Sequence, residues 1–161
     1  MTPFSLIPSV SLSEKTFLET IPIEQWNLIK HSIYTKQPDY CFGCSYTPEN
    51  KKHLQIHLHV ENTNNPELSE FLLLCEGCHS IKHFDITAKN NWCVLVNSVY
   101  SQEELMLKNR HNGLIRKDIM NNKIILIKKT PDEYLAEIIE SRVNINLKTK
   151  ILFGNKFSWH K

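Results

Sequence analysis

The sequence has no long apolar run and no repeated segment, and these absences narrow what the protein can be. No stretch approaches the ~20 apolar residues that a membrane-spanning helix needs. The first twelve residues, MTPFSLIPSVSL, carry no basic region and are interrupted by Pro3 and Pro8, which is not typical of a signal peptide. Internal repeats and low-complexity segments are absent as well. We therefore expect a soluble, cytoplasmic protein.

What the chain does have is enough apolar sequence for a core, since 41% of its 161 residues are hydrophobic. This length suits one domain, or a small domain with extensions. The formal net charge of +2 is unevenly distributed. Residues 41–107 contain eight acidic side chains against four lysines, whereas residues 108–129 have seven basic side chains and one acid. An acidic stretch is thus followed by a basic one, and this arrangement says more about partners than the overall charge does.

Apolar periodicity and capping residues predict a chain of mixed helices and strands. A proline at a first helical position marks one helix at residue 22, and a capping box from Ser101 to Glu104 opens another. Gly113 is the expected stop of that second helix. We predict helices over residues 13–21, 22–37, 78–88 and 101–112, and a further helix from Pro131 that Thr130 caps. Strands are predicted over 54–59, 123–129 and 143–153, and an apolar approach over 68–74.

Four of the five cysteines form two Cys-x-x-Cys pairs, Cys41 with Cys44 and Cys75 with Cys78. A structural Zn²⁺ takes four such ligands in a tetrahedron, so the two pairs complete its coordination with no open position. Paired cysteines in a reducing compartment favour zinc over disulfides, although a redox dithiol is the alternative for either pair alone. We predict a structural zinc and a tight turn at Gly43 that aims two thiolates at the ion. Cys93 is then left over as a buried bystander.

Histidines gather between and after the two cysteine pairs. His57 and His59 lie on one face of the predicted strand, and His79 and His83 share one face of the predicted helix. His57, His79 and His83 would surround a second divalent metal and leave a position open for water or a phosphate oxygen. A histidine pair of this kind is more often solvated or buried in a core. The neighbouring zinc site, however, fixes the helix against the strand and favours the metal site.

The stretch from Cys41 to His83 resembles the HNH (His-Me finger) nuclease family in its four-cysteine form. The matching segments are Leu54-Gln55-Ile56-His57, then LCEGCHSIKH at residues 74–83, followed by VNSVYSQEEL. The resemblance covers about residues 22–108. It implies an α+β fold with a ββα-metal, treble-clef-like zinc finger core, flanking helices and a C-terminal β-α-β extension. We divide the chain accordingly into a helical lead-in (1–40), a zinc-stabilised finger (41–90) and an α/β extension (91–161) packed on the same core.

The resemblance also implies roles for the histidines. In the family, a strand histidine and two helical histidines hold a divalent metal that clamps the scissile phosphate. The corresponding ligands here are His57, His79 and His83, and the ion would be Mg²⁺, Mn²⁺, Ni²⁺ or Zn²⁺.

Two positions depart from the family pattern. The general base follows the strand histidine in the family, and that position is Leu58 here; the loop Asn that orients the base corresponds to Glu70. His59 reaches the site only if the strand bulges. His57 and His59 are therefore the candidate catalytic residues. As alternatives, His59 is an additional ligand or is solvated.

These features predict a metal-dependent endonuclease that hydrolyses nucleic-acid phosphodiesters, with DNA favoured over RNA. The rival is a catalytically degenerate module that binds nucleic acid or a protein partner, as an adaptor or inhibitor. The acidic residues 41–107 oppose the approach of a phosphate backbone, because such contacts usually need Lys or Arg.

The basic stretch of residues 108–129 allows two interpretations. It forms either a phosphate-binding strip or an exposed helix end with an edge strand protected by lysines. No aromatic residues interleave with the charges, so base stacking is not indicated there. The side chains concerned are Lys108, Arg110, Arg116, Lys117, Lys123, Lys128 and Lys129, which together surround only Asp118.

Overall fold

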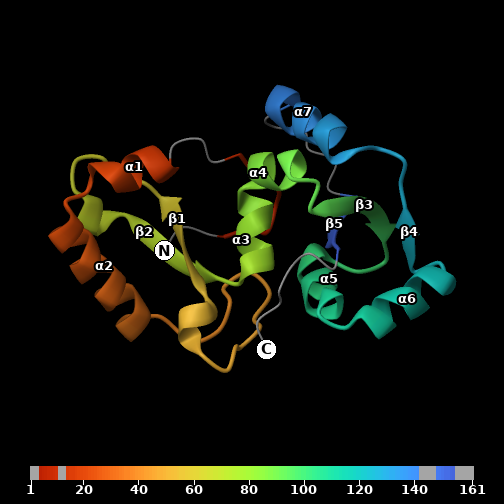
Figure 1. The fold of residues 1–161 in the computed structure, drawn as a ribbon, viewed down its shortest axis with the longest axis horizontal. Helices are drawn as coiled ribbons and strands as arrows, with labels where there is room; N and C mark the ends of the chain where they lie inside the picture. Colours follow the sequence, from red (N-terminus) through yellow and green to blue (C-terminus); the bar gives the residue numbers. More distant parts are fainter. Residues whose placement is uncertain (1–3, 11–13, 142–147, 155–161) are drawn as a thin grey trace.

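The computed structural model describes residues 4–10, 14–141 and 148–154. Figure 1 shows a mixed α and β protein with two small antiparallel sheets, one in each half of the molecule. Within the described part of the chain, no helix is long and apolar enough to cross a membrane.

The first half consists of two helices and a two-stranded sheet. Helix α1 (Glu14–Thr20) and helix α2 (Ile23–Lys36) match the predicted helices to within a residue or two. Strand β1 (Gln55–Val60) pairs with β2 (Glu70–Leu74), and the short 3-10 turns η1 (Lys51–His53) and η2 (Pro66–Leu68) precede them. Helix α2 packs on one face of this sheet through Trp26, whose ring centroid lies 5.7 Å from that of Phe71.

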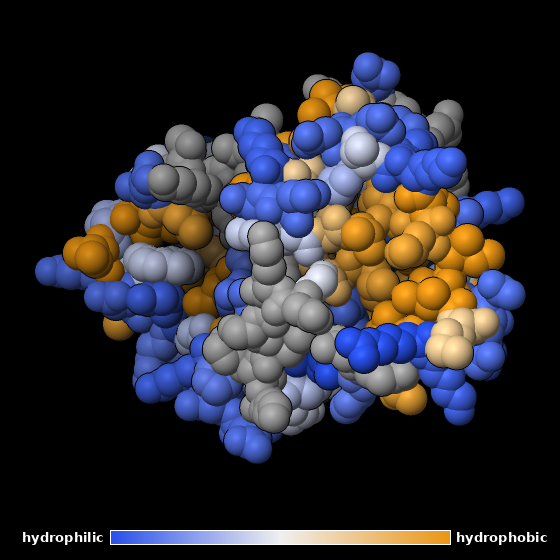
Figure 2. All heavy atoms as spheres, turned by 45° about the vertical axis from the view of Figure 1, so that its right-hand side comes forward, coloured by the Kyte–Doolittle hydropathy of each residue, from blue (hydrophilic) through white to orange (hydrophobic). Residues whose placement is uncertain are grey.

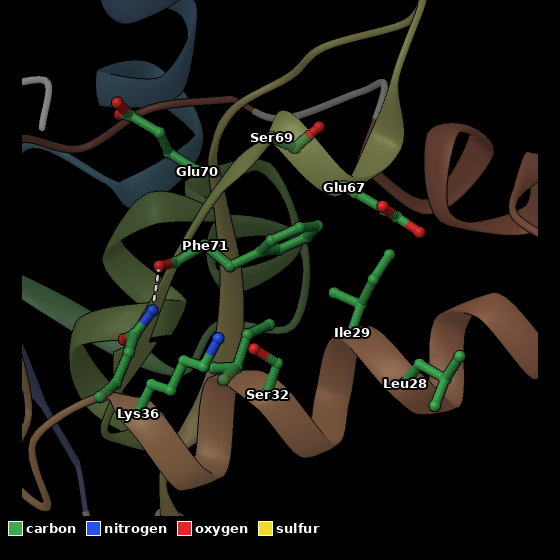
Figure 3. A pocket seen from close by; sticks show the side chains of 10 residues that line it. Leu28, Ile29, Ser32, Lys36, Glu67, Ser69, Glu70 and Phe71 are labelled. Carbon is green, nitrogen blue, oxygen red and sulfur yellow. Dashed lines mark hydrogen bonds between the residues drawn. The ribbon is translucent and has the colours of Figure 1, made fainter.

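Figure 3 shows an open groove of about 610 Å³ between α2 and β2. The ring of Phe71 points toward Ile29, and the Gln37 side-chain amide donates a hydrogen bond to the Phe71 carbonyl. Because side chains alternate along a strand, Phe71 and its opposite residue Leu58 face this groove side of the sheet. Leu72 and its opposite residue His57 face the other side.

The segment after β2 forms two short helices where a single helix over residues 78–88 was predicted, so that prediction is wrong in extent. Helix α3 (Glu76–Lys82) has His83 as its C-cap, and helix α4 (Phe84–Lys89) begins directly after His83. The Phe84 N–H donates to the Ser9 carbonyl at 2.9 Å, and the Ser80 carbonyl accepts from the Thr87 hydroxyl at 2.7 Å. These two bonds replace the helical bond between residues 80 and 84 and break the helix.

The second half holds a three-stranded antiparallel sheet in the order β4-β3-β5. Both predicted capping motifs are present: Ser101 exchanges hydrogen bonds with Glu104, and Thr130 does the same with Glu133. The extension contains more than one β-α-β unit, which corrects the sequence prediction. Its elements are β3 (Cys93–Ser98), α5 (Gln102–Asn109), α6 (Asn112–Met120), β4 (Ile124–Leu126), α7 (Pro131–Ser141) and β5 (Thr149–Phe153).

Two predictions for this half need correction. Gly113 does not end a helix: α5 already ends at Asn109, and Gly113 lies in the first turn of α6. The strand predicted over residues 143–153 is observed as β5 from Thr149, while residues 143–147 lie outside the described part.

One apolar core joins the two halves. Leu74 of β2, Ile81 of α3 and Phe84 of α4 belong to the same buried cluster as Leu95 and Ile151 of the second sheet. A smaller cluster lies on the other face of that sheet, between β3, α5 and α6. The helices α3 and α4 therefore stand in the middle of the molecule, with a sheet on either side (Figure 1).

Candidate metal centres

The four paired cysteines converge at the start of α3. Cys41 and Cys44 come from the loop after α2, Cys75 caps the N-terminus of α3, and Cys78 lies in its first turn. All four sulfur atoms lie within 4.8 Å of one another, and Cys44 Sγ is 3.8 Å from Cys75 Sγ. A tetrahedral zinc with bonds of ~2.3 Å separates its sulfur ligands by about 3.8 Å, whereas a disulfide bond is ~2.0 Å long. The cluster therefore has the dimensions of a four-cysteine zinc site.

The surroundings of the sulfurs also suit a cation. Backbone N–H groups of Gly43 and Cys75 donate to Cys41 Sγ at 3.3 and 3.2 Å. Hydrogen bonds from the neighbouring thiols hold the pKa of Cys41 far below its usual range. Hydrogen bonds with Cys41 first, and with Cys44 next, raise the pKa values of Cys75 and Cys78 well above their usual range. The cluster alone thus opposes full deprotonation, and a divalent cation among the sulfurs would remove that opposition.

Gly43 is required for a different reason from the predicted tight turn. No glycine in the described part of the chain has a positive φ, and the left-handed position in this loop is Ser45, with φ 67°. A Cβ atom on Gly43 would instead lie 2.8 Å from Cys78 Sγ. Glycine therefore serves here because the Cys78 side chain approaches the backbone so closely.

Three histidines converge one helical turn further along. His57 comes from β1, His79 from α3 and His83 from the C-terminal end of α3, and one ring nitrogen of each lies within 4.8 Å of the others. The Nε2 atoms of His79 and His83 are 2.9 Å apart. His57 is 4% exposed and the other two are half-buried. The sequence prediction placed these three residues together, and the structure has them so.

Gln55 orients one of these rings. Its side-chain oxygen lies 2.7 Å from His79 Nδ1, so the Nδ1–H donates to it and the Nε2 of His79 keeps its lone pair for the centre of the cluster. Partners of this kind are the usual outer neighbours of metal-binding histidines. The donor set and its support therefore fit a divalent metal.

The histidine cluster is open on one side. A pocket of about 300 Å³ is lined by His79 and His83 together with Ile86 and Trp92. Three imidazole ligands would leave at least one coordination position of a divalent metal open, and this pocket lies beside two of the three. Gln55, Glu76, Ser80 and Thr87 complete the lining.

The N-terminal segment 4–10 crosses the C-terminal end of α3 and braces the site. Lys82 Nζ donates to the carbonyls of Ser5 and Ile7 at 3.1 and 3.2 Å. The ring of Phe4 makes edge contacts with His57 and His59, with centroid distances of 6.4 and 5.6 Å. Sequence reasoning missed Phe4 at the site, because nothing local marks a contact between residues more than fifty positions apart.

The two positions that depart from the family pattern can now be located. The register of β1 shifts between Leu58 and Val60, which is a bulge at His59. Leu58 lies opposite Phe71 and packs on the apolar core, away from the histidines. Glu70 lies opposite Val60 at the beginning of β2, on the same face of the sheet as His57. The bulge that His59 requires is therefore present, and the Leu58 side chain packs on the apolar core.

The basic stretch is partly engaged in contacts within the protein. Lys108 pairs with Asp118 at 3.2 Å, and Lys129 forms an ion pair with Glu137. The Arg110 guanidinium stacks 3.4 Å above the ring centroid of Tyr46, beside the cysteine cluster. Four cationic side chains of the stretch are exposed: Arg116, Lys117, Lys123 and Lys128.

Comparison with protein-family models, with curated proteins and with solved structures finds no match for this chain.

Proposed function

We propose that the protein is a zinc-stabilised finger of the HNH-like, ββα-metal type that binds a second divalent metal through His57, His79 and His83 and hydrolyses phosphodiester bonds in nucleic acid, with DNA favoured over RNA. The observation that carries the proposal is the convergence of three imidazole nitrogens within 4.8 Å beside an open pocket. The chain order β1, β2, α3, with four cysteines at the start of α3, supports the same assignment.

The chemistry follows from the donor set. A divalent ion at the histidines would supply a Lewis acid that stabilises negative charge on a phosphate oxygen. Gln55 keeps His79 in the tautomer that such an ion needs, and burial of His57 keeps water from that side of the site. We assign His59 the role of proton acceptor for the attacking water, because the bulge brings it to the same Phe4 ring that His57 contacts.

The second candidate is a binding module that keeps the fold and lacks the reaction. Leu58 favours it, because the residue at the family's general-base position packs on the apolar core and cannot accept a proton. On this alternative the histidine site would grip nucleic acid or a protein partner without cleaving it.

Cleavage of plasmid DNA and of single- and double-stranded oligonucleotides by the zinc-loaded protein, with added Mg²⁺, Mn²⁺, Ni²⁺ or Zn²⁺, tests the proposal. We expect metal-dependent cleavage that His79→Ala abolishes and that His59→Ala slows by roughly 10²–10⁴-fold, the usual contribution of a general base. His31→Ala, at an exposed position of α2, is the matched control and should leave the rate unchanged. Cleavage that survives His79→Ala would refute the assignment, and binding without cleavage would favour the second candidate.

A further inference from the structure

The two edges of the three-stranded sheet differ in whether side chains cover their outward backbone groups. The outer edge of β5 is covered by two buried amide side chains of α5. Gln102 exchanges hydrogen bonds with the backbone of Ile151 at 2.8 Å in each direction, and Asn109 does the same with Phe153 at 2.7 and 2.9 Å. These amides take the place of a neighbouring strand, so this edge cannot accept another chain.

No side chain in the described part of the chain covers the edge at β4 in this way. The Val99 N–H bonds the Lys123 carbonyl at 3.1 Å and the Ile127 N–H bonds the Leu95 carbonyl at 3.0 Å. In an antiparallel ladder this alternation turns the backbone groups of Ile124 and Leu126 away from β3, toward the open edge. The edge is therefore a short template for a further strand.

Apolar side chains around this edge are exposed. Figure 2 shows a continuous hydrophobic area on the side of the molecule where β4 and α6 lie in Figure 1. A continuous apolar area of this kind, rimmed by polar groups, marks an interaction site on most soluble proteins. The exposed large apolar residues of β3, β4, α6 and the turn after β3 are Val94 (47%), Val99 (71%), Leu114 (46%), Ile119 (36%), Met120 (82%), Ile125 (52%) and Leu126 (56%).

The exposed charged side chains of α6 and of the two ends of β4 are all basic. Lys123 and Lys128 flank β4 at its two ends, and Arg116 and Lys117 are exposed on α6. The single acid of residues 108–129, Asp118, is buried and paired with Lys108. A ligand for this surface must therefore combine apolar and acidic groups.

We propose that the β4 edge and the apolar surface around it form a docking site for another protein, which adds an extended segment of alternating apolar and acidic residues to the sheet. Backbone bonds to Ile124 and Leu126 would fix the register. Because side chains alternate between the two faces of a strand, apolar side chains of the segment would cover Leu126 on one face and its acids would meet Lys123 on the other. This site is separate from the histidine cluster and does not depend on the function proposed for it.

Other occupants fit less well. A second copy placed across a two-fold axis would bring the same lysines against each other. Nucleic acid would leave an aliphatic area uncovered, because the exposed large apolar residues around β4 include no aromatic ring for base stacking. A lipid surface would leave the outward backbone groups of β4 without partners in hydrocarbon.

Fluorescence anisotropy with a short labelled peptide that alternates valine and glutamate tests the proposal. We expect it to bind the zinc-loaded protein, whereas a valine–lysine peptide and a backbone N-methylated valine–glutamate peptide should not. Leu126→Lys should weaken binding by at least about tenfold, which corresponds to ~1.4 kcal/mol, because it removes a central apolar anchor. Leu28→Lys, at another exposed apolar position, on α2, is the control and should bind normally.

Several outcomes would overturn the proposal. Equal binding of the acidic and basic peptides would show that the surface does not select acidic side chains. Binding that Leu126→Lys leaves unchanged would show that the peptide does not dock at the β4 edge. A dimer detected by light scattering that Leu126→Lys dissolves would make a second copy the occupant. Adsorption to vesicles of anionic phospholipid, or to a DNA duplex, that Leu126→Lys abolishes would assign the surface to a membrane or to nucleic acid. Both variants are at exposed positions, so loss of folding is not expected, and circular dichroism checks it.

Discussion

The cysteine cluster and the histidine cluster share the helix α3 and differ in almost every other respect. The four cysteines are at most 4% exposed and could complete the coordination of a zinc ion, whereas two of the three histidines are half-buried beside a pocket. A complete and buried ligand set can only hold structure together, and an incomplete one beside solvent can also bind a ligand. One short helix thus links a closed site to an open one, and the closed site fixes the geometry of the open one.

Removing a cysteine ligand should have the largest effect. Zinc binding in small structural sites is worth roughly 10–16 kcal/mol, which is comparable with the ~5–15 kcal/mol that stabilises a whole domain. We therefore expect Cys44→Ser to lose zinc and its cooperative thermal unfolding. Metal analysis and circular dichroism would measure the two effects.

Cys93→Ser is the matched control for that substitution. Cys93 is buried outside the cluster, and burial raises its pKa to about 12, so it is a neutral thiol without a role in metal binding. The variant should keep its zinc. If both serine variants lose zinc equally, or if Cys44→Ser unfolds as the parent does, the cysteine cluster is not the structural site.

A smaller loss of stability is expected from a substitution at Gly43, where the backbone lies close to the cysteine cluster. Gly43→Ala introduces a Cβ atom 2.8 Å from Cys78 Sγ, and overpacking of this kind typically costs ~1–3 kcal/mol. Zinc should also dissociate faster in competition with a chelator. Gly154→Ala is the control, because a Cβ atom there meets nothing within 4 Å, and its effect should stay within about 0.5 kcal/mol. Equal stability of the two variants in urea would contradict the close approach.

The metal affinity of the histidine cluster should depend on Gln55, which would not contact the metal itself. Gln55→Ala removes the oxygen that holds His79 in its tautomer, and such outer partners are worth about 10–100-fold in metal affinity. The unfolding temperature should hardly change, since Gln55 is exposed. Lys52→Ala, also exposed and just ahead of β1, serves as the control. Calorimetric titration with Mn²⁺ or Ni²⁺ would detect the difference, and identical affinities would exclude the orienting role.

The sequence revealed both clusters because their ligands follow local rules. Two Cys-x-x-Cys pairs together supply the four ligands of one zinc ion, and two histidines four residues apart on a helix share a face. The helix starts at Ser101 and Thr130 followed from capping chemistry in the same way. Each of these features depends on residues within one or two turns of each other.

The features that were missed depend on distant partners. The break between α3 and α4 is caused by Ser9, which lies 75 positions before Phe84. Gln102 and Asn109 cover the edge of β5 from α5, and nothing in their own neighbourhood distinguishes them from solvated amides. Gly113 was interpreted as a helix stop because glycine favours that position in general, yet a first helical turn tolerates it as well.

The central claim, that α3 carries a closed zinc site and an open second metal site, is tested most directly by a titration of zinc-loaded protein with Ni²⁺ or Mn²⁺. We predict that the protein binds one further ion, that His83→Ala binds none, and that both proteins keep their zinc and their fold. A folded, zinc-loaded protein that binds no further ion, or a His83→Ala variant that binds it as tightly as the parent does, would contradict the claim.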